Sequence, residues 1–148
     1  MSHHSLSRFT DPFLLVDDDP VALDLCARLM QRCGFPQIVT APDGAAALAM
    51  LRQRPYRAVL SDWNMPNMDG LALLEAVRRD ATLRELPFLL TSIDGSPERA
   101  GLARQAGVSA FLMKPFDATT LRPKITEVLL CPRPLPTDAG SPKGGFAA

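Results

Sequence analysis

The 148-residue sequence has few cysteines, no long apolar run and no excess of either charge. Its three cysteines, Cys26, Cys33 and Cys131, are odd in number and lack metal-ligand spacing, which argues against a disulfide framework and fits a reducing compartment. No apolar stretch approaches the roughly 18 residues of a transmembrane helix. Basic and acidic residues number 16 each, so the composition suggests neither nucleic-acid nor membrane binding.

Both ends of the sequence differ from its middle. Residues 1–11 form a polar leader without a signal-peptide core, and the two histidines in it have no acidic or cysteine partner nearby for a metal site. Residues 132–148 are rich in proline and glycine, lack apolar periodicity and are predicted to be disordered. We therefore expect one globular domain, residues 12–131, in a cytoplasmic protein without an attached output domain.

Within this domain, short apolar runs alternate five times with helical patterns. The alternation is typical of βα units and predicts an α/β fold with a mostly parallel sheet. The strands are expected at 12–16, 37–41, 57–61, 87–91 and 109–113. Asp19 is expected to cap a helix that begins at Pro20 and repeats apolar residues at Val21, Leu25 and Leu29. Pro123 interrupts the last helical pattern, so that helix either starts late or loses a hydrogen bond.

Polar side chains stand at the ends of four predicted strands. Asp17 and Asp18 follow the first, Asp62 the third, Ser92 the fourth and Lys114 the fifth. Since the carboxyl ends of parallel strands meet at one edge, where ligands collect, we expect these groups to lie close together. Taken singly, each residue also fits a helix cap, a turn or a surface charge, but four such placements together favour a site.

Three carboxylates at one edge repel each other and require a proton, a cation or separation. A hard divalent cation such as Mg²⁺ takes oxygen ligands of this kind. It would also neutralise the charge that develops when a phosphoryl group moves onto a carboxylate to give an acyl phosphate. Lys114 and Ser92 could then bind phosphoryl oxygens.

These residues, the segment from Leu60 to Gly70 and the run from Lys114 to Phe116 closely resemble the receiver domain of two-component response regulators, in particular the CheY-like single-domain kind. The resemblance implies a flavodoxin-like (βα)5 sandwich with sheet order 2-1-3-4-5. It implies a signalling switch rather than an enzyme. The implied partners are a histidine kinase or a histidine phosphotransfer protein, and a target protein bound by the fourth helix, fifth strand and fifth helix of a monomer or weak dimer.

The resemblance also implies a role for each matching residue. Asp62 would accept the phosphoryl group and bind Mg²⁺ with Asp18, while Asp17 would act through water and Asn64 through its backbone carbonyl. Ser92 would be the switch hydroxyl and Phe111 the switch aromatic. Lys114 would bind the phosphoryl group through its ammonium, and its peptide bond to Pro115 would be cis. Asp94, together with Asn64, would tune hydrolysis of the acyl phosphate.

Two positions depart from the family pattern. Ile93 stands where the family usually has alanine or glycine, so its bulk should narrow access to Asp62 and slow small donors such as acetyl phosphate. Phe111 lacks the phenol hydroxyl that chemotaxis regulators typically present to their motor target, and Pro123 alters the same face. Motor binding is therefore not expected.

Two other functions remain open from the sequence. The run Asp17-Asp18-Asp19-Pro20-Val21 matches the opening signature of haloacid-dehalogenase-type aspartyl phosphatases, although that fold needs a late acidic pair at a strand end, which this chain lacks. In that case Asp17 would be the nucleophile. A receiver-shaped interaction module that takes no phosphate is the third alternative.

Overall fold

The computed structural model describes residues 10–130, which form a five-stranded parallel sheet with order β2-β1-β3-β4-β5. The strands are β1 (Phe13–Val16), β2 (Ile38–Ala41), β3 (Ala58–Asp62), β4 (Phe88–Ser92) and β5 (Ala110–Met113). The flavodoxin-like strand order expected from the resemblance is confirmed, and each strand begins one residue later than the apolar runs suggested. The leader to residue 9 and the segment from residue 131 lie outside the described residues, so the predictions made for them are untested.

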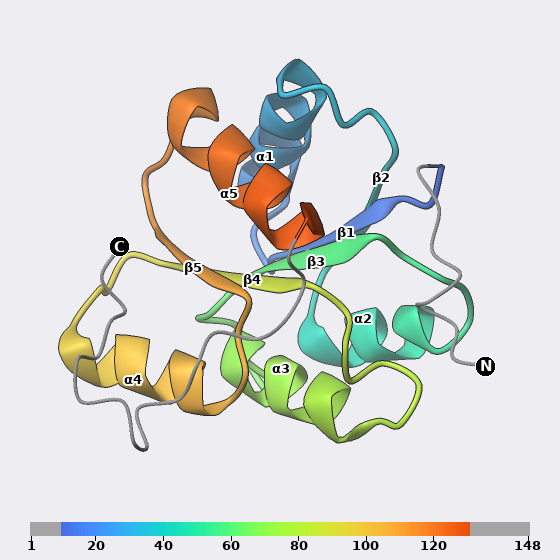
Figure 1. Ribbon diagram of the computed structural model, residues 1–148, viewed down its shortest axis with the longest axis vertical. Coiled ribbons are helices and arrows are strands. Elements are labelled where there is room, and N and C mark those ends of the chain that lie inside the picture. The colour runs from blue at the N-terminus through green and yellow to red at the C-terminus, as the bar shows by residue number, and fades with distance from the viewer. Residues whose placement is uncertain (1–9, 131–148) are drawn as a thin grey trace.

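Five helices cover the two faces of the sheet within the described range (Figure 1). Helices α1 (Pro20–Arg32) and α5 (Ala118–Leu130) lie on one face, and α2 (Gly44–Leu51), α3 (Gly70–Arg79) and α4 (Pro97–Gln105) on the other. Each face has its own apolar cluster, one around Phe13, Leu15 and Ile125 and the other around Leu14, Leu73 and Phe88. Burial on both faces explains why the strands are continuous apolar runs rather than alternating ones.

Side chains cap four of the helices. The carboxylates of Asp19, Asp43 and Asp69 and the hydroxyl of Ser96 each accept a hydrogen bond from a backbone N–H in the first turn of α1, α2, α3 and α4. Such a cap satisfies an amide that has no partner inside the helix. The cap of α1 predicted from the sequence is confirmed.

Of the apolar stripe expected on α1, only Leu29 packs against the core. Val21 and Leu25 are 65% and 61% exposed, whereas Met30 is fully buried and Leu23 and Cys26 pack against the core. Two apolar stripes with the same four-residue spacing run along this helix, and the spacing alone could not show which one meets the sheet. The helix therefore presents apolar side chains to solvent.

Helix α5 runs through Pro123 without interruption, so of the two outcomes that the sequence allowed, the lost hydrogen bond applies and the late start does not. Leu121, Ile125 and Val128 are its buried residues. Proline has no N–H to donate to the carbonyl four residues earlier, so the helix loses one hydrogen bond at Thr119. The packing of its apolar face compensates for this loss.

Arg78, near the C-terminal end of α3, joins this helix to the connections before β4 and β5. Its guanidinium donates to the carbonyl oxygens of Gly107 at 2.8 Å, Arg84 at 2.8 Å and Leu86 at 2.7 Å, and to Ser109 Oγ at 3.3 Å. These contacts satisfy backbone acceptors in the connections before β4 and β5, which lie outside the strands. The side chain therefore holds both connections against α3.

Candidate functional site

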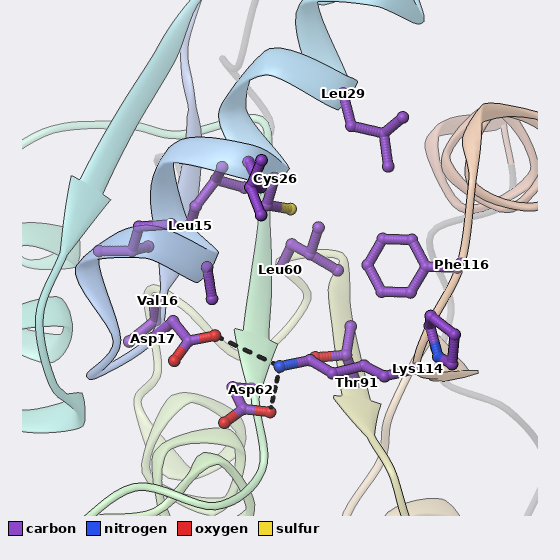
Figure 2. Close-up of a pocket in the computed structure, with 14 residues that line it drawn as sticks. Leu15, Val16, Asp17, Cys26, Leu29, Leu60, Asp62, Thr91, Lys114 and Phe116 are labelled. Carbon is purple, nitrogen blue, oxygen red and sulfur yellow. Dashed lines mark hydrogen bonds and ion pairs between the residues drawn. The ribbon is translucent and has the colours of Figure 1, made fainter.

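The predicted polar residues lie at the carboxyl edge of the sheet. Asp62 is the last residue of β3, where it is paired in register with Thr91, and Ser92 is the last residue of β4. Asp17 follows β1 directly and Lys114 follows β5 directly. Figure 2 shows the side chains of Asp17, Asp62 and Lys114 pointing toward one another.

Lys114 bridges two carboxylates at this edge. Its Nζ lies 2.9 Å from Asp62 Oδ1 and 3.3 Å from Asp17 Oδ2, and each of these carboxylate side chains is only 12% exposed. Burial raises the pKa of the Asp62 carboxyl above its usual range, and Lys114 opposes this rise without cancelling it. Burial would lower the pKa of Lys114, but its bonds to Asp62 and Asp17 outweigh burial and raise it. The ammonium therefore stays charged at neutral pH.

Three carboxylates are close enough to share one cation. Asp17, Asp18 and Asp62 each offer an oxygen, and these oxygens lie within 4.8 Å of one another. Asp18 is exposed, whereas Asp17 is largely buried and accepts a hydrogen bond from the Asp19 amide at 3.0 Å. One lysine cannot balance three negative charges. The donor set is all oxygen, partly fixed and partly open to water, which suits a hard divalent cation such as Mg²⁺.

Ser92 lies beside Asp62 on the neighbouring strand but does not bond to it. Its side chain is fully buried, and its Oγ accepts a hydrogen bond from the Asp94 amide at 3.0 Å. Asp94 in turn accepts from the Ser96 amide at 2.9 Å, and this contact lowers the pKa of Asp94. Ile93 is 72% exposed and does not line the cavity that contains Asp62. The access-limiting role expected of it stays a prediction.

The residues after Asp62 connect the site to β5. Trp63 is 3% exposed, and its ring meets the partly buried ring of Phe111 edge-on, with centroids 5.9 Å apart. The side-chain oxygen of Asn64 accepts a hydrogen bond from Arg99. The Lys114–Pro115 peptide bond is cis, as the resemblance implied.

Gly70, at the start of α3, closes the loop that follows Asp62. Its amide donates to the Trp63 carbonyl at 2.8 Å, and a Cβ at this position would lie 2.2 Å from the Asp62 carbonyl oxygen. No side chain fits such a gap, so only glycine permits this approach. The close contact holds the backbone of Asp62 against the helix.

A cavity of about 270 Å³ extends from the carboxylates beneath α1 (Figure 2). Besides Asp17, Asp62 and Lys114 it is lined mainly by apolar side chains of α1 and of the segment after β5, including Leu25, Leu29 and Phe116. Cys26 also lines it, and burial raises the pKa of its thiol to about 12, so it is not a nucleophile at neutral pH. Cys26 and Cys33 are free thiols within the described residues.

The sequence did not single out Arg99 or Trp63, although both contact the loop after Asp62. Arg99 is one of 13 arginines and follows the cap of α4 by three residues, a position with no motif of its own. Trp63 directly follows Asp62, but only its contacts with Phe111 and Arg99 distinguish it from an ordinary core residue.

Comparison with known proteins gives a consistent result. Residues 13–126 match the model of the response regulator receiver domain. The chain is 37% identical over 115 residues to chemotaxis protein CheY-3 of Vibrio cholerae, an alignment that covers 78% of this chain and 88% of that protein. The same identity over 115 residues relates it to the CheY protein of Pseudomonas aeruginosa, 93% of which is covered. The crystal structure of V. cholerae CheY4 superposes with a TM-score of 0.74 at 30% identity, covering 80% of this chain and 98% of that one.

Proposed function

The chain belongs to the response regulator receiver domain family, and we propose that it accepts a phosphoryl group on Asp62 in a Mg²⁺-dependent two-component switch. The observation that carries this proposal is the pairing of Lys114 with both Asp62 and Asp17 at the edge where the three carboxylates converge. A purely structural ion pair would need only one carboxylate to balance the ammonium of Lys114. A bound cation would account for the additional carboxylates.

Asp62 is the acceptor that best fits the geometry. It is central in the cluster, is partly open to solvent and ends a middle strand of the sheet. In the reaction one oxygen of Asp62 forms a bond to phosphorus while the bond from phosphorus to the donor's imidazole nitrogen breaks. The imidazole leaves and takes up a proton. Lys114, already 2.9 Å from the attacking carboxylate, balances the added negative charge.

The cation would be held by Asp18, Asp62 and the backbone carbonyl of Asn64, with Asp17 acting through water. When bound, Mg²⁺ supplies positive charge against the phosphoryl oxygens. Burial of Asp17 and Asp62 keeps these carboxylates fixed, so little rearrangement is needed on binding. The donor is a histidine kinase or a histidine phosphotransfer protein in the cytoplasm.

The signal would leave the site through Ser92 and Phe111. Movement of the buried Ser92 hydroxyl toward a phosphoryl oxygen would release the Asp94 amide and change the loop before α4. Phe111 would follow, because it packs on Trp63 next to Asp62. The output face is formed by α4, β5 and α5, where Leu102 and Met113 are about half exposed and available to a protein target. Contact with such a target is the form of output we propose.

The direct test is to incubate the chain with Mg²⁺ and a promiscuous histidine kinase and to locate the label by mass spectrometry. One acyl phosphate on Asp62 is expected. A label on Asp17 with rapid turnover of phosphomonoesters would instead support a phosphatase. Absence of label with every donor would favour an interaction module that takes no phosphate.

Mg²⁺ affinity is expected to fall as the pH decreases from 7.5 to 5, because a protonated Asp62 cannot bind the ion. Burial raises the pKa of Asp62, so protons compete at a higher pH than at an exposed aspartate, whose pKa is about 3.9. Titration calorimetry at three pH values measures the Mg²⁺ affinity. Asp18→Asn should weaken binding about tenfold or more, whereas Asp24→Asn on the exposed side of α1 should not. Equal affinity at pH 5 and 7.5 would contradict the assignment.

Ile93→Ala is expected to speed labelling by acetyl phosphate about threefold, which corresponds to about 0.7 kcal/mol in the barrier. The smaller side chain should widen the approach of a small donor to Asp62. The rate of label appearance is measured by mass at several donor concentrations. Leu102→Ala, which removes an exposed apolar side chain from α4 instead of from the loop after β4, is the matched control. An unchanged rate in Ile93→Ala would show that this side chain does not limit access.

A further inference from the structure

Arg99, in the first turn of α4, reaches across to the loop that follows Asp62. Its Nη2 donates to Asn64 Oδ1 at 3.1 Å, and its guanidinium carbon lies 4.3 Å from the centre of the Trp63 ring. On the other side its Nε lies 3.7 Å from Asp94 Oδ2. One side chain thus contacts the loop after β3 and the loop after β4.

The guanidinium of Arg99 is held rather than solvated. Its side chain is 25% exposed, and its Nη1 is buried without a hydrogen-bond partner among the described residues. Burying an N–H without an acceptor is costly, so the arginine would turn to water if its other contacts did not keep it in place. The planar guanidinium lies over the ring of Trp63, while the N–H groups at its edge contact Asn64 and Asp94.

The two loops that Arg99 connects are those that border the acceptor. Asn64 is two residues from Asp62. Asp94 is two residues from Ser92, and its amide donates to the Ser92 hydroxyl. Because Asp94 contacts both Arg99 and Ser92, the arginine also restrains the segment that positions this hydroxyl.

We propose that Arg99 is a positioning residue that clamps these two loops together and thereby prolongs the acyl phosphate on Asp62. The second part rests on the proposed function of Asp62. Hydrolysis of an acyl phosphate requires a water molecule to reach phosphorus in line with the departing carboxylate. A guanidinium that spans the gap between the loops restricts that approach.

The test compares Arg99→Ala and Arg99→Lys with the wild-type chain. Lysine keeps the positive charge but cannot stack flat on Trp63 and bond to both loops. After the donor is removed, loss of the label from Asp62 should be about fivefold faster in both variants, the size expected for the net loss of one ordinary hydrogen bond. Arg79→Ala removes the same charge from an exposed site on α3, and this variant should lose the label at the wild-type rate.

Two readouts on the unphosphorylated protein report the clamp itself. Hydrogen exchange at the amides of Asp94 and Ser96 should become about tenfold faster in both Arg99 variants. The emission of Trp63, the only tryptophan, should change in Arg99→Ala and not in Arg79→Ala. Thermal unfolding monitors whether the variants remain folded.

The possible results separate the two proposals. Unchanged hydrogen exchange in both Arg99 variants would overturn the clamp. So would loss of the label at the wild-type rate in Arg99→Lys, because a positive charge alone would then be enough to prolong the acyl phosphate. Faster exchange together with faster decay supports it. If the wild-type chain takes no label, the proposed function fails, and the proposed effect of Arg99 on the lifetime of the acyl phosphate fails with it. The hydrogen-exchange rates still decide whether Arg99 joins the loops.

Discussion

Asp62→Asn is expected to abolish phosphorylation, with a loss of at least about a hundredfold in label, because a carboxamide lacks the anionic oxygen that attacks phosphorus. The change is nearly isosteric, so the carboxyl edge of the sheet should keep its shape. Lys114 loses its 2.9 Å partner but retains Asp17 at 3.3 Å. Mass spectrometry of the intact chain after incubation with kinase and Mg²⁺ measures the effect.

Asp17→Asn is the matched control for this experiment. It removes the other carboxylate bound by Lys114 and weakens the cation site, yet it leaves the proposed acceptor in place. We expect slower labelling that still maps to Asp62. Label that persists in Asp62→Asn and maps to Asp17 would contradict the assignment of the acceptor and favour the phosphatase alternative.

Arg78→Met is expected to destabilise the fold by about 3 kcal/mol, within the range for removal of a buried hydrogen-bonding hub. The three backbone carbonyls that Arg78 binds would lose this charged donor. Burial lowers the pKa of Arg78 to about 10, so the side chain is charged at neutral pH and its bonds are charge-assisted there. Urea unfolding of the whole chain gives the free energy.

Arg79→Met provides the comparison, since Arg79 is exposed on the same helix and its loss should cost less than about 0.5 kcal/mol. Arg78→Lys should recover little of the stability, because a single ammonium cannot serve three separated carbonyls. If Arg78→Met unfolds at the same urea concentration as the wild type, the connections before β4 and β5 do not depend on this side chain.

The sequence predicted the sheet and the central acidic residues because both follow from local patterns. Apolar runs mark buried parallel strands, and polar residues directly after them must share one edge. Asp17, Asp62 and Lys114 were placed correctly by this rule alone. Caps such as Asp19 before Pro20 are equally local, so they too could be read from adjacent residues.

The parts that could not be predicted depend on tertiary contacts. Spacing identified Val21 and Leu25 as a helical stripe, but only packing shows that Met30, on another side of α1, is buried. Arg99 gave no signal because its role arises from Trp63 and Asn64, which are about 35 residues away in sequence.

The close approach of Gly70 to Asp62 has a consequence for engineering. The hydrogen bond between Gly70 and Trp63 closes the intervening loop at its base, so the base and not the tip sets the position of the acceptor. Pro66 and Asn67, at the tip, are exposed. A tag or fluorescent peptide inserted between them should leave Asp62 in place, and the same loop could therefore carry a sensor that reads each phosphorylation event beside the site where it occurs.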